Sequence, residues 1–201
     1  MAKLYFRYGA MGCGKTRDLI KVWYNYKENG KNAIIVKPSV DTKAGINISS
    51  RDGMEHKVDL LISKRDNIYK IISKFILTNN LDCILVDEAQ FLERKHVEQF
   101  ADIVDYLNIP VICYGLRADF KNNLFVGSHA LFIYADVIEE MKTICRCLKN
   151  ATRNVRFVNG KIALEGGQIA IDGEDKVTYE PMCRKCQKEA LNDARKERLE
   201  K

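Results

Sequence analysis

The sequence has few of the residues and runs that mark unusual protein classes. Its 201 residues include three prolines, three histidines and one tryptophan, and no apolar run approaches the length of a membrane span. We find no internal repeat, no low-complexity segment before the charged C-terminal end, and no apolar signal-peptide core at the start. These absences argue against a membrane or repeat protein and predict a cytoplasmic one.

The composition is that of an ordinary globular protein. Hydrophobic residues make up 46% and charged residues 30% of the chain. Its 201 residues give room for one full domain and a small appendage. The net charge is +6, and much of the excess follows Cys183. That excess fits a nucleic-acid surface, a polyanionic substrate or simply a solvated helix.

A glycine-rich turn near the start predicts a phosphate-binding loop. Residues 4–8 alternate as a strand does, and the turn after them, which fits G-x-x-x-x-G-K-[ST], is followed by apolar residues at helical spacing. The backbone N–H groups of such a loop, at the positive end of a helix, bind anions. We expect Lys15 to reach the β- and γ-phosphates of a nucleotide and Thr16 to ligate Mg²⁺. The loop consists of Gly9, Ala10, Met11, Gly12, Cys13, Gly14, Lys15 and Thr16.

Strand and helix patterns alternate after this loop and predict a doubly wound α/β domain. Strands are expected at residues 33–37, 82–86 and 109–115, and helices at residues 18–26, 68–76 and 97–107. Residues 135–141 favour a further strand, with a helical turn as the alternative. Residues 38–57 and 115–128 read as loops, and the first is long enough to be functional or mobile.

An acidic pair follows the strand at residues 82–86. Asp87 stands where a nucleotide site needs a carboxylate for Mg²⁺, and Glu88 is one residue beyond, where it can accept a proton from an attacking hydroxyl or water. The alternative is an acidic loop pair without a catalytic role.

Seven cysteines in a cytoplasmic chain point to metal binding or packing rather than disulfides. Cys83 and Cys113 lie in apolar strands and are expected in the core. The remaining thiols outside the phosphate loop form two close pairs, Cys145-x-Cys147 and Cys183-x-x-Cys186, which predict a closed structural Zn²⁺ site, with free thiols as the alternative. The scattered histidines, His56, His96 and His129, are expected to be exposed or hydrogen-bonded, with His96 on the charged side of its helix.

The composition changes near residue 143, which predicts a second, small domain. We expect a nucleotide-binding domain at residues 1–142, a zinc-binding domain at residues 143–187, and a charged helix or tail at residues 188–201. The zinc would fold a segment too small to bury a core of its own.

Several motifs together resemble the type II thymidine kinases of bacteria, in the same order over nearly the whole chain. They are residues 9–16, Asp87-Glu88-Ala89-Gln90-Phe91, Tyr114-Gly115-Leu116-Arg117-Ala118-Asp119-Phe120, the four paired cysteines and Tyr179. The resemblance implies a P-loop NTPase-like (RecA-like) sheet with a zinc domain carrying a lasso-like lid at about residues 166–179. It implies transfer of the ATP γ-phosphate to the 5′-hydroxyl of thymidine, and also of deoxyuridine, for nucleotide salvage.

The resemblance also implies roles for individual residues. Glu88 would be the proton acceptor, and Asp87, Glu88, Ala89 and Gln90 would join residues 9–16 around ATP, with Thr16 and Asp87 on Mg²⁺. The thymidine pocket would be formed by Met11, Phe91, Leu116, Phe120, Phe125 and Tyr179. A homotetramer inhibited by dTTP, with no nucleic-acid polymer and no membrane as partner, is implied as well.

Three other functions remain open at this stage. The acidic box and basic tail also fit a nucleic-acid-stimulated ATPase, although 201 residues hold only one of the two α/β cores that a helicase motor needs. A non-enzymatic zinc module that binds nucleotide is a second alternative, and a kinase for another nucleoside is a third.

Overall fold

A parallel six-stranded sheet forms the larger part of the computed structural model, which describes residues 1–39, 47–50, 53–168 and 176–199. Its strands run in the order β5-β2-β6-β7-β1-β8, and every pairing is parallel. The strands are β1 (Leu4–Tyr8), β2 (Ala33–Pro38), β5 (Leu60–Ile62), β6 (Cys83–Val86), β7 (Val111–Gly115) and β8 (Val137–Glu140). The predicted doubly wound α/β sheet is confirmed, and residues 135–141 do contain a strand.

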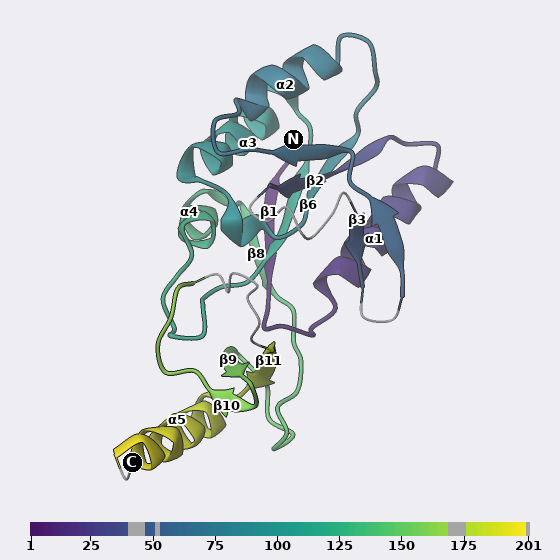
Figure 1. Cartoon of the computed structure of the whole chain (residues 1–201). Coiled ribbons are helices and arrows are strands. Elements are labelled where there is room, and N and C mark those ends of the chain that lie inside the picture. Colours follow the sequence, from purple (N-terminus) through teal and green to yellow (C-terminus); the bar gives the residue numbers. More distant parts are fainter. Residues whose placement is uncertain (40–46, 51–52, 169–175, 200–201) are drawn as a thin grey trace.

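Helices cover both faces of this sheet (Figure 1). Helix α1 (Lys15–Glu28) packs on one face, where Leu19 and Ile20 join the inward side chains of the strands. Helices α2 (Ile68–Phe75), α3 (Arg94–Leu107) and α4 (Val126–Tyr134) pack on the other. Strands buried on both faces need continuous apolar runs, and all four residues of β6 are buried. Cys83 and Cys113 are fully buried, as predicted.

Two parts of the chain differ from the loops predicted for them. Within residues 38–57 the structure has a hairpin of β3 (Asn47–Ser49) and β4 (Glu55–Lys57), while residues 40–46 and 51–52 lie outside the described part. The loop predicted at residues 115–128 ends earlier, because α4 begins at Val126. Strands of three residues are too short to show a period, and α4 is apolar on nearly all sides, so neither gives the amphipathic pattern on which the prediction relied.

The prediction for His96 was wrong. Its side chain is buried, with 2% of the residue exposed, and not on the charged side of α3. It occupies the third position of the helix, where Nδ1 accepts a hydrogen bond from the N–H of Glu93 in a reciprocal cap. Desolvation by burial lowers the pKa of His96, which favours the neutral imidazole that accepts this hydrogen bond.

A smaller unit lies below the sheet in Figure 1. It contains an antiparallel sheet in the order β10-β9-β11 and the C-terminal helix. Its elements are β9 (Arg153–Val158), β10 (Lys161–Ile162), β11 (Val177–Met182) and α5 (Arg184–Leu199). Helix α5 is continuous across residues 187 and 188, where the sequence suggested a domain boundary, and its Ala190 packs beside Cys145 and Val155. The division into three parts stays a prediction.

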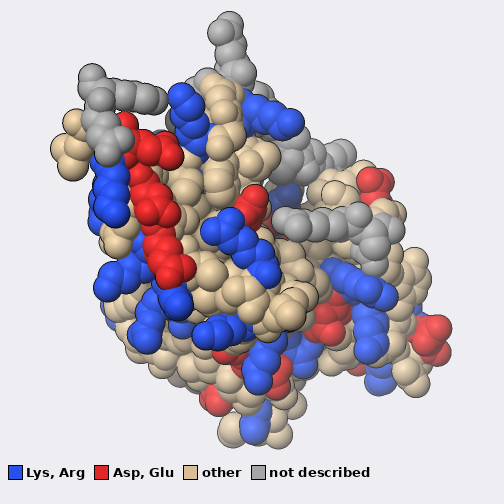
Figure 2. Space-filling model, turned by 90° about the horizontal axis from the view of Figure 1, so that it is seen from below, with Lys and Arg blue, Asp and Glu red and all other residues tan. Residues whose placement is uncertain are grey.

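Charges of both signs share the surface. Figure 2 shows Lys and Arg side chains interspersed with Asp and Glu on the face seen from below. On α5, Lys185 pairs with Glu189, and Arg198 reaches Glu165 outside the helix. Part of the positive charge at the C-terminal end is therefore balanced locally. Among the described helices, none is long and apolar enough to cross a bilayer.

Candidate active site

The phosphate loop joins β1 to α1 through two left-handed glycines. Gly12 and Gly14 have φ angles of +77° and +83°, a region that side chains with a Cβ rarely adopt, and Gly14 directly precedes the first turn of α1. A Cβ on Gly9 would overlap the carbonyl oxygen of Met141 and the Cys13 sulfur. The glycines are therefore required by the curvature of the loop and by the β8 chain beside it.

The acidic end of β6 lies next to this loop, although β7 separates β6 from β1 in the sheet. The Thr16 hydroxyl is 3.5 Å from Oδ2 of Asp87. Asp87 is only 5% exposed, and this burial, together with the charge of Glu88, raises the pKa of Asp87 to about 7. The Lys15 amine donates to the carbonyl oxygen of Ala10 at 3.1 Å. A hydroxyl and a buried carboxylate thus meet at the start of α1.

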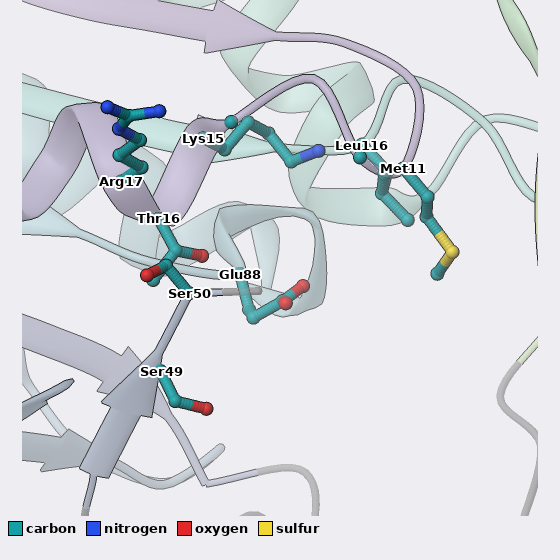
Figure 3. A pocket seen from close by; sticks show the side chains of 10 residues that line it. Met11, Lys15, Thr16, Arg17, Ser49, Ser50, Glu88 and Leu116 are labelled. Atoms are coloured by element: carbon teal, nitrogen blue, oxygen red, sulfur yellow. The ribbon is translucent and has the colours of Figure 1, made fainter. Parts of the chain in front are cut away.

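Glu88 has an unusual backbone conformation that directs its side chain. Its φ of +50° lies in the left-handed region, and a 3₁₀ turn, η2 (Ala89–Phe91), follows it. The carboxylate points into a cavity of about 430 Å³, and Figure 3 shows Lys15 and Met11 around the same space. The cavity is lined by Met11, Gly12, Gly14, Lys15, Thr16, Arg17, Ser49, Ser50, Glu88 and Leu116.

A second, apolar cavity adjoins the first. All six residues predicted for the thymidine pocket line this space of about 220 Å³: Met11, Phe91, Leu116, Phe120, Phe125 and Tyr179. Two of them, Met11 and Leu116, line both cavities. The rings of Phe91 and Phe125 meet edge to face, with their centroids 5.6 Å apart. A flat, partly apolar ligand fits such a space beside the phosphate loop.

Arg156 on β9 fixes the chain at one end of this second cavity. Its guanidinium lies 3.9 Å from the centre of the Phe120 ring and donates from Nε to the Tyr179 hydroxyl at 2.8 Å. The other two nitrogens each donate at 2.9 Å, to the carbonyl oxygens of Gly167 and Gln168. Arg156 is 4% exposed, so its charge is stabilised by carbonyl dipoles and ring faces. Residues 169–175 of the predicted lasso lie outside the described part of the chain.

The four paired cysteines converge in the smaller unit. The sulfur atoms of Cys145, Cys147, Cys183 and Cys186 all lie within 4.8 Å of one another, and that of Cys147 is 3.6 Å from that of Cys183. Sulfur atoms around a tetrahedral Zn²⁺ are about 3.8 Å apart, since each Zn–S bond is about 2.3 Å. Leu148 turns the chain with a φ of +64°, and the N–H of Cys145 donates to Lys149, which brings both thiols of the first pair to one side. The set fits a structural Zn²⁺.

Other residues at the site were not predicted from the sequence. Ser49, Ser50 and Arg17 line the first cavity. Asn154 lines the second and accepts a hydrogen bond from the N–H of Met11 at 2.8 Å, which connects β9 to the phosphate loop. Asn154 and Arg156 are buried polar residues on one strand. Asn154 and Arg156 alternate with the apolar residues Val155 and Phe157 along β9, and this alternation was the available signal.

These features are those of the P-loop class of nucleotide-binding proteins: a glycine-rich loop between a strand and a helix, an acidic strand end beside it and an adjoining cavity. A family model described as thymidine kinase matches residues 2–187. The chain belongs to the thymidine kinase family. This confirms the resemblance and favours a kinase over a nucleic-acid-stimulated ATPase or a non-enzymatic zinc module.

Individual relatives cover almost the full length of the chain. It is 42% identical over 196 residues to a thymidine kinase of Francisella tularensis subsp. holarctica, covering 95% of this chain and 99% of the relative. It is 46% identical over 187 residues to one of Lactiplantibacillus plantarum, covering 92% and 94%. With one of Listeria monocytogenes it shares 48% identity over 189 residues, covering 92% and 96%.

Proposed function

We propose that this chain transfers the γ-phosphate of ATP to the 5′-hydroxyl of thymidine, giving dTMP and ADP in nucleotide salvage for DNA synthesis. Deoxyuridine is accepted as well. The observation that carries the proposal is that the phosphate-loop cavity and the apolar cavity adjoin at Met11 and Leu116, with the Glu88 carboxylate in the first of them. Membership of the thymidine kinase family supports the choice of nucleoside.

The phosphate loop holds ATP in this proposal. The N–H groups of residues 9–16 surround the phosphates, and the Lys15 amine exchanges the Ala10 carbonyl for the β- and γ-phosphate oxygens. At the end of β6, Glu88 borders the nucleotide. Thr16 and Asp87 supply the oxygen ligands that Mg²⁺ prefers, and their separation of 3.5 Å fits one shared ion. When bound, Mg²⁺ neutralises the charge that develops on the transferred group.

Glu88 acts as the general base. The 5′-hydroxyl oxygen forms a bond to the γ-phosphorus while the bond from that phosphorus to the bridging oxygen of ADP breaks, and the hydroxyl proton passes to the Glu88 carboxylate. The left-handed backbone at Glu88 supports this role, because it turns the carboxylate toward the cavity and away from the sheet. Backbone strain of this kind is often retained at functional sites.

The thymine base occupies the apolar cavity. Phe91 and Phe125 present an aromatic corner, and Phe120 and Tyr179 line the same space. A pocket of this kind distinguishes a base with a methyl group from one without it by only about 1–3 kcal/mol, which is why deoxyuridine is also a substrate.

The zinc cysteines hold the part of the chain that closes over the nucleoside. We propose residues 1–142 as the ATP-binding domain, residues 143–187 as the zinc and lid domain, and residues 188–201 as a charged C-terminal helix or tail. With four thiolate ligands the Zn²⁺ has no open position, so its role is structural. Arg156 transmits that rigidity to Gly167, Gln168 and Tyr179.

The direct test is incubation of the purified protein with Mg-ATP and a panel of thymidine, deoxyuridine, deoxycytidine and deoxyguanosine. We expect ADP formation with thymidine and deoxyuridine, and dTMP and dUMP as the phosphorylated products by mass spectrometry. ATP hydrolysis that rises with single-stranded DNA and leaves thymidine unchanged would contradict the proposal.

Replacing Arg156 with Lys should weaken nucleoside binding. A lysine keeps the positive charge but loses the planar donors that hold two carbonyl oxygens and the Tyr179 hydroxyl at once. We expect KM for thymidine to rise about 10-fold, the effect of losing one or two charge-assisted hydrogen bonds, while KM for ATP stays within twofold. Steady-state kinetics measure both. Arg153→Lys is the matched control, since Arg153 lies on the same strand and donates to the carbonyl oxygen of the adjacent Thr152; an equal effect of the two changes would refute the role of Arg156.

Assembly and regulation follow the family resemblance. We propose a cytoplasmic homotetramer that is inhibited by dTTP, the end product of the pathway that dTMP enters. Exposed apolar side chains on α4 and the edge strand β8 support an interface there: Val126, Ile133 and Ile138 are 58%, 55% and 45% exposed. Light scattering of the purified protein tests the assembly, and inhibition of turnover by added dTTP tests the regulation.

A further inference from the structure

Gln90 has a different environment from the one predicted for a residue that contacts ATP. It lies in η2, is 2% exposed, and does not line either cavity of the site. Its side-chain amide lies between two groups, the carboxylate of Glu88 and the backbone N–H of Leu116. Gln90 therefore contacts the general base from the protein side and not from the nucleotide side.

The chemistry of the two neighbours fixes the orientation of the amide. The backbone N–H of Leu116 can only donate, so the group 3.0 Å from it must be the amide oxygen Oε1. The amide nitrogen Nε2 then faces Oε2 of Glu88, and an ionised carboxylate can only accept. Both ends of the amide are matched, and turning it over would place a donor against a donor and an acceptor against an acceptor.

A second layer holds the amide in place. The Ser128 hydroxyl on α4, which is fully buried, donates to the carbonyl oxygen of Leu116 at 2.5 Å. The backbone of Leu116 is therefore held at both its N–H and its carbonyl oxygen. A Cβ on Gly115 would come within 2.9 Å of the Gln90 amide oxygen, and one on Gly127 would overlap the carbonyl oxygen of Ala89. Two glycines thus allow β7 and α4 to close tightly around η2.

We propose that Gln90 is a positioning residue for Glu88, held by the backbone N–H of Leu116, a residue whose carbonyl oxygen is in turn held by Ser128. The inference rests on the proposed function, because it gives Glu88 the role of base. The Gln90 amide restrains one carboxylate oxygen, Oε2, and leaves Oε1 to receive the 5′-hydroxyl proton. A base restrained in this way loses less conformational freedom when the hydroxyl approaches.

Leu116 also connects these hydrogen bonds to the nucleoside cavity. Its side chain lines both cavities, as Figure 3 shows for the phosphate-loop side, while its backbone holds Gln90. A nucleoside that packs against Leu116 therefore contacts the residue whose backbone N–H fixes the Gln90 amide, and Gln90 in turn orients Glu88. The wall of the nucleoside cavity and the direction of the Glu88 carboxylate are therefore coupled through one residue, Leu116.

The test compares Gln90→Glu and Gln90→Leu with the wild type. In Gln90→Glu the shape is kept and one oxygen still accepts from Leu116, but the donor that faces Glu88 becomes an acceptor. In Gln90→Leu both hydrogen bonds are lost. We expect kcat for thymidine to fall about 10- to 100-fold in both, since a misdirected catalytic group costs up to about 100-fold, while KM for ATP changes less than about threefold.

Two further variants separate positioning from folding. Ser128→Ala removes the outer hydrogen bond, and we expect a smaller fall in kcat, about three- to tenfold, by the same loss of orientation. Gln99→Leu is the matched control, because the Gln99 amide on α3 also accepts from a backbone N–H, that of Ile68 on α2, and neither residue lines a cavity of the site. It should lower the melting temperature to an extent similar to Gln90→Leu with kcat within twofold of wild type.

Two outcomes would overturn the inference while the wild type phosphorylates thymidine. One is unchanged kcat in Gln90→Glu, which would mean that the amide does not orient the base. The other is a tenfold rise in KM for ATP at unchanged kcat, which would make Gln90 a nucleotide contact. A wild-type protein without thymidine turnover would instead refute the proposed function, so the two failures are distinguishable.

Discussion

Replacing Glu88 with Gln is expected to remove most thymidine turnover while ATP still binds. The amide has nearly the shape of the carboxylate but cannot accept the 5′-hydroxyl proton, and general-base catalysis is worth about 10²- to 10⁴-fold. The substitution leaves the phosphate loop between β1 and α1 unchanged, because Glu88 lines the cavity from the end of β6. We therefore expect kcat to fall by a factor of about 10² or more at little change in ATP affinity. Single-turnover kinetics and equilibrium binding of ATP measure the two quantities.

The control for this variant is a carboxylate outside the site. Glu28 is exposed at the end of α1, and Glu28→Gln makes the same chemical change there. It should turn over thymidine at the wild-type rate. Glu88→Gln with unchanged kcat would remove Glu88 as the base, and loss of ATP binding in this variant would assign it to the nucleotide instead.

Loss of the Zn²⁺ site is expected to impair thymidine binding before it affects the α/β domain. Cys183→Ser removes one of four converging ligands, and structural Zn²⁺ in small domains contributes an apparent binding free energy of about 10–16 kcal/mol. The core around that cluster is small, with Ala151, Val155, Met182 and Ala190 as its buried apolar members beside the thiols. We expect weaker zinc retention and faster hydrogen exchange in residues 143–168 and 176–187, while the strands of the parallel sheet stay protected.

The kinetic consequence follows from the contacts of Arg156. If β9 and β11 loosen, Arg156 no longer aligns Tyr179 with Phe120, so KM for thymidine should rise about 10-fold or more, the range seen when the support of a site is removed. Cys83→Ala is the matched control, since Cys83 is a buried thiol in β6 outside the cluster, and it should retain one zinc per chain. Equal thymidine affinity with and without bound metal would argue against a structural link between the cysteines and the nucleoside site.

The elements that could be predicted were those whose signal is local. The phosphate loop is a run of eight residues, the amphipathic helices repeat every 3.6 residues, and the buried strands are apolar throughout, so each is readable without its neighbours. Elements with weak local signals were missed. Strand β5 and the hairpin β3–β4 have three residues per strand, and α4 has apolar side chains on its exposed side, at Val126 and Ile133, as well as on its buried side.

The sequence by itself determined a nucleotide-binding α/β chain with a phosphate loop, an acidic strand end and a four-cysteine set, and the family resemblance indicated which aromatic residues belong to one pocket. Only the tertiary structure decided that Arg156 holds Gly167, Gln168 and Tyr179 and that Gln90 contacts Glu88 through an amide fixed by Leu116. The physical reason is that these contacts depend on different elements: Arg156 on β9 reaches the chain beyond β10, and the Gln90 amide in η2 is fixed by the N–H of Leu116, which follows β7. A hydrogen bond between them depends on strand register and helix packing, which no single stretch of sequence encodes.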